Sequence, residues 1–446
     1  METTAARPSL FARALRSSAV TAGGYAASQA LRLGANLILT RLLFPEAFGL
    51  MALVTVWIVG LTMFSDVGLG PGISRSKRGD DPVFLDTAWT IQAARGGLLW
   101  LGTCALAWPA ALFYGAPELA VVLPVAGLGL LIGGFSPTRI ETANRHLLLG
   151  RVTALDLLSQ LVGTVVMVLL AWQMRSVWAL VLGTLVGTVV RLALMHLYLP
   201  GHRDRLRWNA DAGRELVSFG KWIFLSTACG FLLSQGDKAI LGRFLTLEQL
   251  GVYNIGYFLA SFPMLLGQAV TLRILIPLYR DHHPATGEAN FRKMRRLRLG
   301  ILGGVMALVA CMALGGPWVV DLLYDDRYAA AQAVVVAIAL VQLPQLIGMT
   351  YDQAALAAGD SRTFFWVMAA RAGAQTFAFL AGVSLAGLQG ALAGQFIAVL
   401  LMHGAIIWLA RRYRVWDGWI DLVLAACAAL VIALAVLLHG GLLAAL

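Results

Sequence analysis

Long apolar stretches separated by short polar segments run along the whole chain. A helix that crosses a lipid bilayer needs about 20 consecutive, mostly apolar residues, and thirteen windows have about this length. They are residues 17–39, 47–68, 87–113, 119–140, 152–172, 177–199, 216–242, 249–276, 297–323, 328–350, 363–385, 388–410 and 419–440. The pattern predicts an all-α integral membrane protein with about thirteen transmembrane helices, and twelve or fourteen spans are the alternatives.

The composition agrees with a chain that lies mainly in lipid. Hydrophobic residues make up 59% of the 446 residues and charged residues only 13%, whereas soluble domains contain about 25% charged residues. The net charge is +11, but the excess lies in loops. It therefore indicates membrane orientation rather than nucleic-acid binding.

Positive charge alternates from loop to loop. Cytoplasmic loops are rich in Lys and Arg, so a cytoplasmic, uncleaved N-terminus places the basic loops on the inside. These loops lie at residues 75–78, 139–151, 203–214, 280–298, 362 and 411–414, and Arg139 and Arg298 are counted among their basic residues. The opposite loops hold only Arg41, Arg175, Arg243 and Arg327. An odd number of spans then places the C-terminus on the periplasmic side.

A weak repeat relates the two halves of the chain. Residues 39–49 match residues 241–251 at a shift of 202, with Arg, Glu and Gly at equivalent positions. Six predicted spans precede a polar linker and six follow it, so the two copies form a parallel repeat. We predict an N-terminal six-helix lobe (1–200), a cytoplasmic linker (201–215), a C-terminal six-helix lobe (216–413) and an accessory helix with a tail (414–446). A central cavity is expected between the two lobes.

The first predicted span carries a polar stripe at helical spacing, and the shift of 202 leads to small or polar residues in the seventh span. Polar side chains at membrane depth face protein or a hydrated cavity. We therefore predict that the polar cavity lining consists of Tyr25, Ser28, Gln29, Asn36, Thr227 and Ser234. Close helix packing through small and polar residues is the alternative.

Basic residues also occur inside the predicted spans. Each costs about 2.5–3.5 kcal/mol at the bilayer centre, and a guanidinium fork matches the oxygens of a phosphate. The predicted substrate-binding cations are Arg32, Arg95, Arg191, Lys238, Arg273 and Arg371. Asp237 is the candidate for ion or proton coupling, with ion pairing to a neighbouring cation as the alternative.

No motif indicates catalysis or a bound cofactor. Cys104, Cys229, Cys311 and Cys427 lie singly in apolar segments, without the spacing of a zinc site or a disulfide framework. The predicted loops are too short for a folded catalytic domain. We expect a protein that is not an enzyme, with no cofactor, no metal and no nucleic-acid partner.

Four segments carry a family resemblance: residues 41–49, residues 64–70 with Asp66 and Gly68, residues 144–151 and residues 250–253. In this order and spacing, over residues 10–413, they resemble the polysaccharide (lipid-linked oligosaccharide) flippase family, similar to O-antigen flippases. That family belongs to the multidrug/oligosaccharidyl-lipid/polysaccharide exporter superfamily. We interpret Asp66 and Gly68 as structural, forming a helix end and a close backbone approach.

The resemblance implies a transporter that flips polyprenyl-diphosphate-linked oligosaccharide across the bacterial inner membrane, by alternating access, during lipopolysaccharide or exopolysaccharide biosynthesis. The implied partners are this substrate, membrane lipids and polysaccharide assembly enzymes, and a two-lobe chain is expected to act as a monomer. One alternative is an ion-coupled drug or metabolite exporter of the same superfamily. A membrane polymerase or glycosyl ligase is disfavoured by the short outside loops. The sequence identifies neither the glycan nor the energy source.

Overall fold

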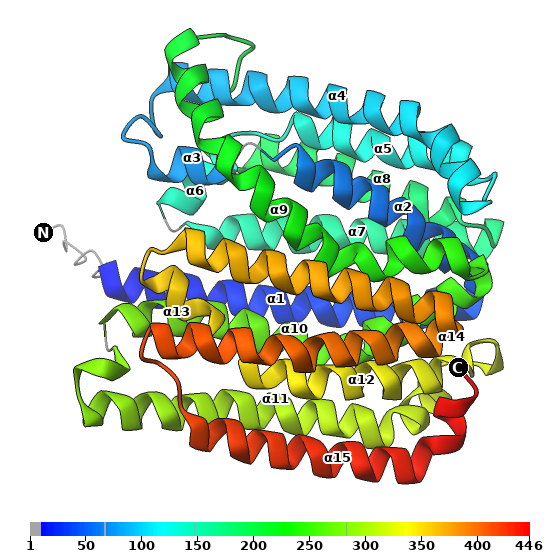
Figure 1. Cartoon of the computed structure of the whole chain (residues 1–446). Coiled ribbons are helices and arrows are strands. Elements are labelled where there is room, and N and C mark those ends of the chain that lie inside the picture. The colour runs from blue at the N-terminus through cyan, green and yellow to red at the C-terminus, as the bar shows by residue number, and fades with distance from the viewer. Residues whose placement is uncertain (1–9, 67, 147, 282) are drawn as a thin grey trace, which may run out of the picture. The chain divides into compact units, whose positions relative to one another are not determined.

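The computed structural model describes residues 10–66, 68–146, 148–281 and 283–446, and throughout these ranges helices are joined by turns and short loops (Figure 1). The chain divides into two compact units, unit 1 through Thr227 and unit 2 from Ala228 onward. The division lies within α9 (Ala210–Phe244), which carries the chain from one unit to the next. The lobe boundaries expected from the sequence stay a prediction.

Unit 1 is built from paired helices. Its elements before α9 are α1 (Leu10–Leu42), α2 (Pro45–Phe64), α3 (Leu69–Arg75), α4 (Pro82–Tyr114), α5 (Leu119–Gly134), α6 (Arg139–Arg145), α7 (Leu149–Met174) and α8 (Trp178–Tyr198). The pairs α4–α5 and α7–α8 have the most extensive contacts, and α1 packs on α7. Glycines bring the paired backbones together: a Cβ atom built on Gly163 of α7 would lie 2.8 Å from the Cα atom of Gly187 on α8. Small residues at such contacts are typical of membrane helices.

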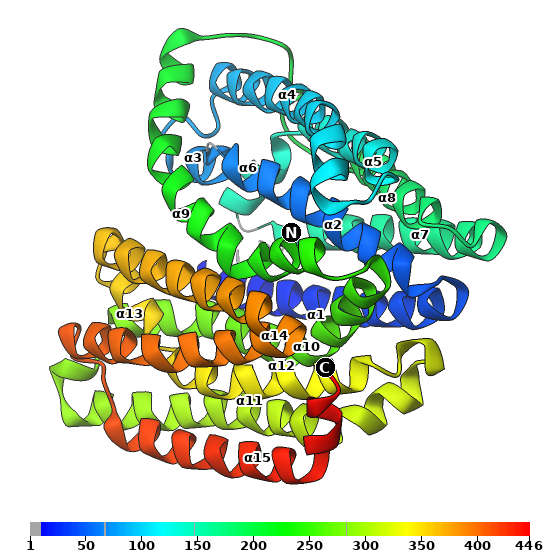
Figure 2. The same ribbon diagram turned by 45° about the vertical axis from the view of Figure 1, so that its right-hand side comes forward.

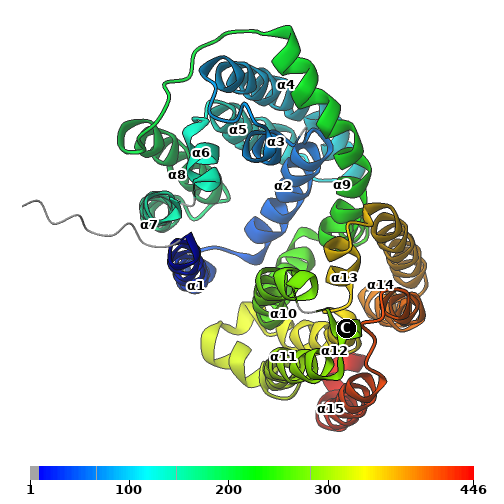
Figure 3. The same cartoon turned by 90° about the vertical axis from the view of Figure 1, so that its left-hand side faces the viewer.

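Unit 2 is arranged around a buried helix. After α9 it contains α10 (Leu247–Asp281), η1 (Pro284–Thr286), α11 (Glu288–Leu323), η2 (Asp326–Tyr328), α12 (Ala331–Gly348), α13 (Asp352–Ala357), α14 (Ser361–Arg412) and α15 (Gly418–Ala444). α12 packs on α10, α11, α14 and α15, and it is buried on nearly all sides (Figure 3). α12 is apolar almost all round, and a helix of this kind is stable when all its faces are buried, as they are here against four neighbouring helices.

α14 consists of two antiparallel halves. The helical backbone breaks at Ala386 and Gly387, and Gly387 has a φ of 57°, in the region that favours glycine. The two halves then lie side by side (Figures 1 and 2), and a Cβ atom on Gly382 would lie 2.0 Å from the carbonyl oxygen of Gly390. The predicted spans 363–385 and 388–410 correspond to these halves.

Each of the thirteen predicted spans overlaps at least one helix among the described residues, and the chain is a multi-pass membrane protein. Within the described residues, nine helices are long and apolar enough to cross a membrane, and the bent pair α5–α6, with an angle of 61°, makes a tenth candidate. α14 counts once in this set although it is folded back on itself. The exact number of spans therefore stays a prediction.

The turn between α2 and α3 has the structural role expected for Asp66 and Gly68. The Asp66 Oδ1 atom accepts a hydrogen bond from the Gly68 backbone N at 2.8 Å. Gly68 has a φ of 65° and precedes the first turn of α3. A carboxylate that bonds the backbone two residues onward stabilises such a turn, so these residues shape the chain.

The last helix, α15, is part of the unit 2 core rather than peripheral to it. Ile420, Leu424 and Ala428 pack in the same apolar cluster as residues of α11 and α12. The start of the helix is held by an ion pair, in which Arg295 Nε lies 2.6 Å from Asp417 Oδ2. The sequence repeat did not include this helix, but its packing makes it integral to the unit.

Candidate functional site

A cavity of about 190 Å³ lies inside unit 2. It is lined from α10, from α12 and the segment that follows it, and from the first half of α14. The lining residues are Met264, Gln268, Thr271, Gln345, Met349, Asp352 and Arg371. Because each ordered water occupies about 30 Å³, the cavity has room for several waters or for one small polar group.

An ion pair forms one wall of this cavity. Arg371 Nη1 donates to Asp352 Oδ2 at 2.8 Å, and the two side chains are only 17% and 15% exposed. Among the described residues, Asp352 Oδ1 and Thr271 Oγ1 are buried without a hydrogen-bond partner. An unsatisfied buried polar group costs about 1–3 kcal/mol. Water or a polar ligand in the cavity would remove this cost.

A second, smaller pocket adjoins the first. It shares Gln345 and Arg371 with the first cavity and adds Gln375 and His403 from the two halves of α14. Arg371 is thus part of both linings. The combined lining is half polar and half apolar by residue type, and it carries the Arg371 cation and the Asp352 carboxylate in a largely apolar unit.

The cavity continues a polar stripe along α10. The stripe consists of Tyr253, Tyr257, Ser261, Gln268 and Thr271. Intervals of three, four and seven residues place these side chains on one helix face. At 1.5 Å per residue the stripe is about 27 Å long, close to the roughly 30 Å hydrocarbon thickness of a bilayer.

Buried partners accompany the stripe. Tyr253 donates to Asp237 Oδ2 at 2.7 Å, and Gln342 Nε2 of α12 donates to Ser261 Oγ at 3.1 Å. Lys238 Nζ lies 4.0 Å from the ring centroid of Tyr257, which is a cation–π contact. The stripe therefore has a buried charge pair near each end, Asp237–Lys238 and Asp352–Arg371.

Of the predicted cations, Lys238 and Arg371 lie in this polar interior. Lys238 Nζ is 3.7 Å from Asp237 Oδ2, which is the ion-pairing alternative that the sequence left open for Asp237. Whether Asp237 also couples transport to an ion stays a prediction.

Two other predicted cations have structural partners in unit 1. Arg95 Nη2 donates to the carbonyl oxygen of Thr62 at 2.7 Å, and Arg95 Nε donates to Ser65 Oγ at 2.9 Å. Arg95 thus satisfies a carbonyl in the last turn of α2. Arg191 of α8 pairs with Asp156 of α7 at 2.6 Å. Both partnerships hold helices together, so substrate contact by these two residues stays a prediction.

Arg32 is exposed on α1. The side chain of Arg273 lies outside the described residues. Neither position tests the predicted contact with substrate.

One of the predicted polar residues of α1, Ser28, contacts α7. Ser28 Oγ donates to Gln160 Oε1 of α7 at 2.7 Å, and Gln160 Nε2 donates back to the Ser28 carbonyl at 3.1 Å. Gln29, which is buried, donates to Tyr25 on the same helix. For Ser28 this is the packing alternative that the sequence left open.

The remaining predicted lining residues lie on α1 and α9. Asn36 and Thr227 are partly buried, whereas Ser234 is exposed and donates to the Phe231 carbonyl at 3.4 Å. Their role in a cavity between the lobes stays a prediction.

Sequence reasoning missed several cavity residues. Four residues line the cavity but were not among the candidates. They are Gln268 and Thr271 on α10, Gln345 on α12 and Asp352 at the start of α13. The available signal was their spacing, three residues from Gln268 to Thr271 within a predicted span and seven residues from Gln345 to Asp352, which lies just after one. It was weaker than the charge of the arginines, because glutamine and threonine also occur in ordinary helix contacts.

Two arginines counted among the loop residues are buried instead. Arg298 is 1% exposed, and it donates to Thr350 Oγ1 at 3.0 Å and to the Val415 carbonyl at 3.2 Å. Arg139 is 8% exposed and donates to the Leu199 carbonyl at 2.6 Å. Backbone and hydroxyl oxygens accept from both guanidinium groups, which lowers the cost of burying them. Arg298 Nη2 is nevertheless buried without a hydrogen-bond partner among the described residues, and this guanidinium lies over the Tyr351 ring, 4.1 Å from its centroid.

Comparison with known proteins gives relatives along most of the chain. Residues 38–333 match the family described as "Polysaccharide biosynthesis protein". The succinoglycan biosynthesis transport protein ExoT of Rhizobium meliloti is 23% identical over 377 residues, covering 83% of this chain and 74% of ExoT. The lipopolysaccharide biosynthesis protein WzxC of Escherichia coli is 21% identical over 403 residues, covering 87% of this chain and 80% of WzxC.

Solved structures of multidrug resistance transporters share the fold. An inward-facing MATE family transporter of the MOP superfamily has a TM-score of 0.65 at 17% identity, covering 86% of this chain and 94% of the transporter. An outward-facing one has a TM-score of 0.58 at 14% identity, covering 94% and 97%. By its match over residues 38–333, the chain belongs to the polysaccharide biosynthesis protein family, and its fold is that of the MATE transporters.

Proposed function

We propose that this protein is a flippase that moves a polyprenyl-diphosphate-linked oligosaccharide across the bacterial inner membrane for the synthesis of surface polysaccharide. The observation that carries the proposal is the family match, which runs from the end of α1 into α12 and so includes parts of both units. Relatives whose names specify succinoglycan transport and lipopolysaccharide biosynthesis support this substrate class. The transporter fold supports movement rather than catalysis.

The cationic residues provide the chemistry for a diphosphate. Arg371 is the first choice in unit 2, because its guanidinium lines both pockets and its partner Asp352 has an oxygen without a described hydrogen bond. Arg32 is the first choice in unit 1, because its side chain is exposed on α1, within the first predicted span. A diphosphate would compete with Asp352 for Arg371 and would form charge-assisted hydrogen bonds with it.

The size of the unit 2 cavity limits what it can hold. Drug-sized ligands occupy pockets of about 300–1,000 Å³, whereas this cavity is about 190 Å³. It fits one polar group of a substrate rather than an oligosaccharide. In the proposed mechanism of alternating access, the glycan passes between the two lobes while cations such as Arg371 and Arg32 hold the diphosphate.

The proposal includes a membrane orientation and a set of contacts. The basic loops lie on the cytoplasmic side with the N-terminus, and the C-terminus lies on the periplasmic side. The chain acts as a monomer among membrane lipids and receives its substrate from polysaccharide assembly enzymes. Access of a membrane-impermeant reagent to single cysteines introduced at Arg243 and Arg412 tests this orientation.

The direct test uses cells that lack this protein. Lipid extracts should accumulate polyprenyl-diphosphate oligosaccharide, and surface polysaccharide should be lost. Wild-type protein should restore both, whereas Arg32→Ala protein present at equal amounts in the membrane should restore neither. Unchanged lipid-linked pools with an intact surface, in cells without a redundant flippase, would overturn the proposal.

A second candidate function is an ion-coupled drug or metabolite exporter. The buried carboxylate of Asp237, held by Tyr253 and close to Lys238, favours it, as does the fold shared with multidrug transporters. Overexpression should then confer resistance to cationic dyes, and Asp237→Asn should abolish the resistance. Dye sensitivity that does not change on overexpression would remove this candidate.

A further inference from the structure

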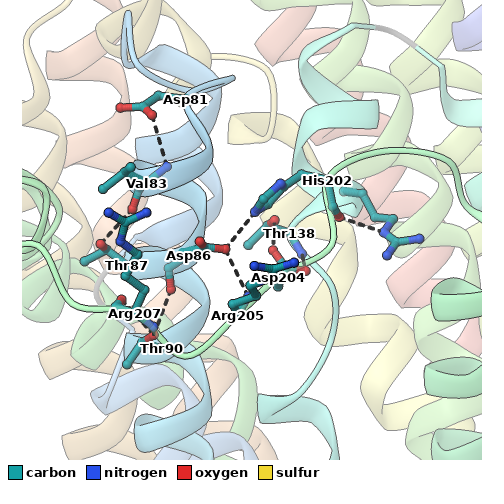
Figure 4. Close-up of polar contacts among 11 residues, drawn as sticks. Asp81, Val83, Asp86, Thr87, Thr90, Thr138, His202, Asp204, Arg205 and Arg207 are labelled. Atoms are coloured by element: carbon teal, nitrogen blue, oxygen red, sulfur yellow. Dashed lines mark hydrogen bonds and ion pairs between the residues drawn. The ribbon is translucent and has the colours of Figure 1, made fainter.

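The segment that joins α8 to α9 is fastened to α4 at two successive helical turns. The backbone N of Arg205 donates to Asp86 Oδ1 at 3.0 Å, and the backbone N of Arg207 donates to Thr90 Oγ1 at 3.0 Å (Figure 4). This joining segment, residues 199–209, follows α8 and leads directly into α9. Its attachment to α4 therefore fixes one end of the covalent connection between the two units.

Three potential metal ligands meet at this attachment. Asp86 comes from α4, and His202 and Asp204 come from the joining segment. One ligand atom from each residue lies within 4.8 Å of the others, and the Asp86 carboxylate is nearly fully buried (Figure 4). None of these residues belongs to the polar interior of unit 2.

The existing hydrogen bonds leave room for coordination. His202 Nε2 lies 2.7 Å from Asp86 Oδ1, and Asp204 Oδ2 accepts from the Thr138 backbone N at 3.0 Å. The Thr138 hydroxyl also bonds Asp204. An ionised carboxylate has about four acceptor positions, and the described bonds use two on each Asp. Both carboxylates therefore retain acceptor capacity.

The joining segment is not short of positive charge, because Arg203, Arg205 and Arg207 lie beside His202 and Asp204 in the chain. Within the described residues, however, the ion-pair partner of Asp86 is His202, and Asp204 has hydrogen bonds from Thr138 only. The nearby Arg139 donates to the backbone carbonyls of His202 at 3.1 Å and Leu199 at 2.6 Å. A divalent ion would bind both carboxylates directly and would replace the proton at His202 Nε2.

We propose that Asp86, His202 and Asp204 bind one divalent transition-metal ion of the Zn²⁺ type. Zn²⁺ accepts both imidazole nitrogen and carboxylate oxygen ligands, with bonds of about 2.0–2.2 Å. Calcium and magnesium prefer oxygen ligands alone. Tetrahedral ligands at such bond lengths are about 3.3–3.5 Å apart, so binding requires His202 Nε2 and Asp86 Oδ1, which are 2.7 Å apart, to separate slightly while the three side chains adjust around the ion. Thr138 orients Asp204 from the outer shell.

The bound ion would strengthen the attachment of the joining segment to α4. It would thereby stiffen the chain between unit 1 and α9 and make the connection between the units sensitive to metal. This role is independent of the substrate that the protein moves.

Metal binding is measured on full-length, untagged protein stripped with chelator and dialysed against Zn²⁺. His202→Gln keeps an N–H donor for Asp86 but replaces the imidazole, and Asp204→Asn keeps an acceptor for Thr138. His146→Gln is the matched control, because His146 pairs with the exposed Asp80 at 2.9 Å. Bound zinc by mass spectrometry and the thermal midpoint are the two readouts.

Wild type and the His146→Gln control should each hold about one Zn²⁺ and should melt at a higher temperature with Zn²⁺ than with chelator. The affinity should fall at least about tenfold in His202→Gln and Asp204→Asn, and their melting should not respond to Zn²⁺. Zinc binding in wild type that equals that of His202→Gln, or no binding in wild type, would overturn the proposal. The attachment would then be held by hydrogen bonds alone.

Discussion

The two units share an order of helices but differ in what their interiors contain. In unit 1 the order is α1, α2, α3, α4, α5, α6 and then the antiparallel pair α7–α8. In unit 2 the corresponding elements are α9, α10, η1, α11, α12, α13 and then the two antiparallel halves of α14. In unit 1 the paired helices approach through glycines such as Gly163 and Gly187. In unit 2 the contact of α10 with α12 carries the polar stripe and the cavity. The two units therefore share an order of helices but place different side chains at their helix contacts.

The ion pairs show the same difference. Arg191 and Asp156 in unit 1 are 39% and 41% exposed, whereas Arg371 and Asp352 in unit 2 are 17% and 15% exposed. Removing one member of a buried pair leaves an uncompensated charge. This cost should be smaller for Asp156, which is 41% exposed and lies about two turns from the start of α7. The similar pairs should therefore respond very differently to the same substitution.

The largest expected effect comes from Arg371→Met. It should lower the free energy of unfolding by about 3–5 kcal/mol, because Asp352 is left buried without its cation. Arg191→Met, the matched control, should lower it less, because its partner Asp156 is 41% exposed rather than 15%. Denaturant unfolding in detergent measures both, and equal losses would contradict the assigned difference in burial.

A double variant separates stability from transport at the same site. Arg371→Met with Asp352→Leu removes both charges, so stability should return to near that of the wild type. Transport should remain low, since the cavity no longer carries a cation. Full transport by this folded variant would show that Arg371 does not contact substrate.

Tyr253→Phe should have the next largest effect. It removes the hydrogen bond to the Asp237 carboxylate, and bonds to charged groups contribute about 1.5–3 kcal/mol. Tyr198→Phe, at a position 63% exposed at the end of α8, should change stability little. Thermal melts of the two variants at one pH give the comparison, and indistinguishable midpoints would argue against a buried Asp237–Tyr253 bond.

Glycine substitutions test the packing of unit 1. Gly163→Ala should destabilise by about 1–3 kcal/mol, because its Cβ atom would overlap the α8 backbone. Gly97→Ala on α4 should instead stabilise slightly, by up to about 1 kcal/mol from helix propensity, since a Cβ atom there meets no atom within 4 Å. Opposite signs in unfolding experiments are the expected result, and a shared sign would count against glycine-mediated contact.

The smallest expected effect is a pH dependence at the start of α14. The Thr363 backbone N–H, the Tyr413 hydroxyl and the Thr363 hydroxyl all donate to Asp360, and they lower its pKa from 3.8 to about 2. Because the folded pKa lies below the unfolded one, this stabilisation is complete above pH about 4 and is lost as the pH falls towards 2. Asp360→Asn should flatten that part of the stability profile. An unchanged profile would mean that other carboxylates set it.

The sequence predicted the helices better than their interiors. Apolar length alone located spans such as 87–113 and 249–276, because a bilayer imposes a minimum helix length. The helix end expected at Asp66 and Gly68 is observed between α2 and α3, whereas the close backbone approach stays a prediction. Both results depend on interactions between residues close in sequence.

The cavity could not be predicted in the same way. Asp352 and Arg371 are brought together by the turn from α13 into α14, and Gln345 and Gln268 line one cavity because α12 packs on α10. Periodicity shows that such residues share a helix face but not which helix covers it. Arg298 was counted among the basic loop residues, but it is buried. Its partners Thr350 and Val415 are remote in sequence, so the sequence alone did not indicate this burial.

Leaflet accessibility in proteoliposomes tests the proposed function most directly. Vesicles containing a lipid-linked oligosaccharide and the purified protein are treated with a membrane-impermeant glycosidase, alongside protein-free vesicles and vesicles with the Arg371→Met/Asp352→Leu variant. Wild-type protein should make the protected inner-leaflet oligosaccharide accessible to the enzyme, whereas the variant and the empty vesicles should leave it protected. Equal protection in all three would contradict flipping by this protein.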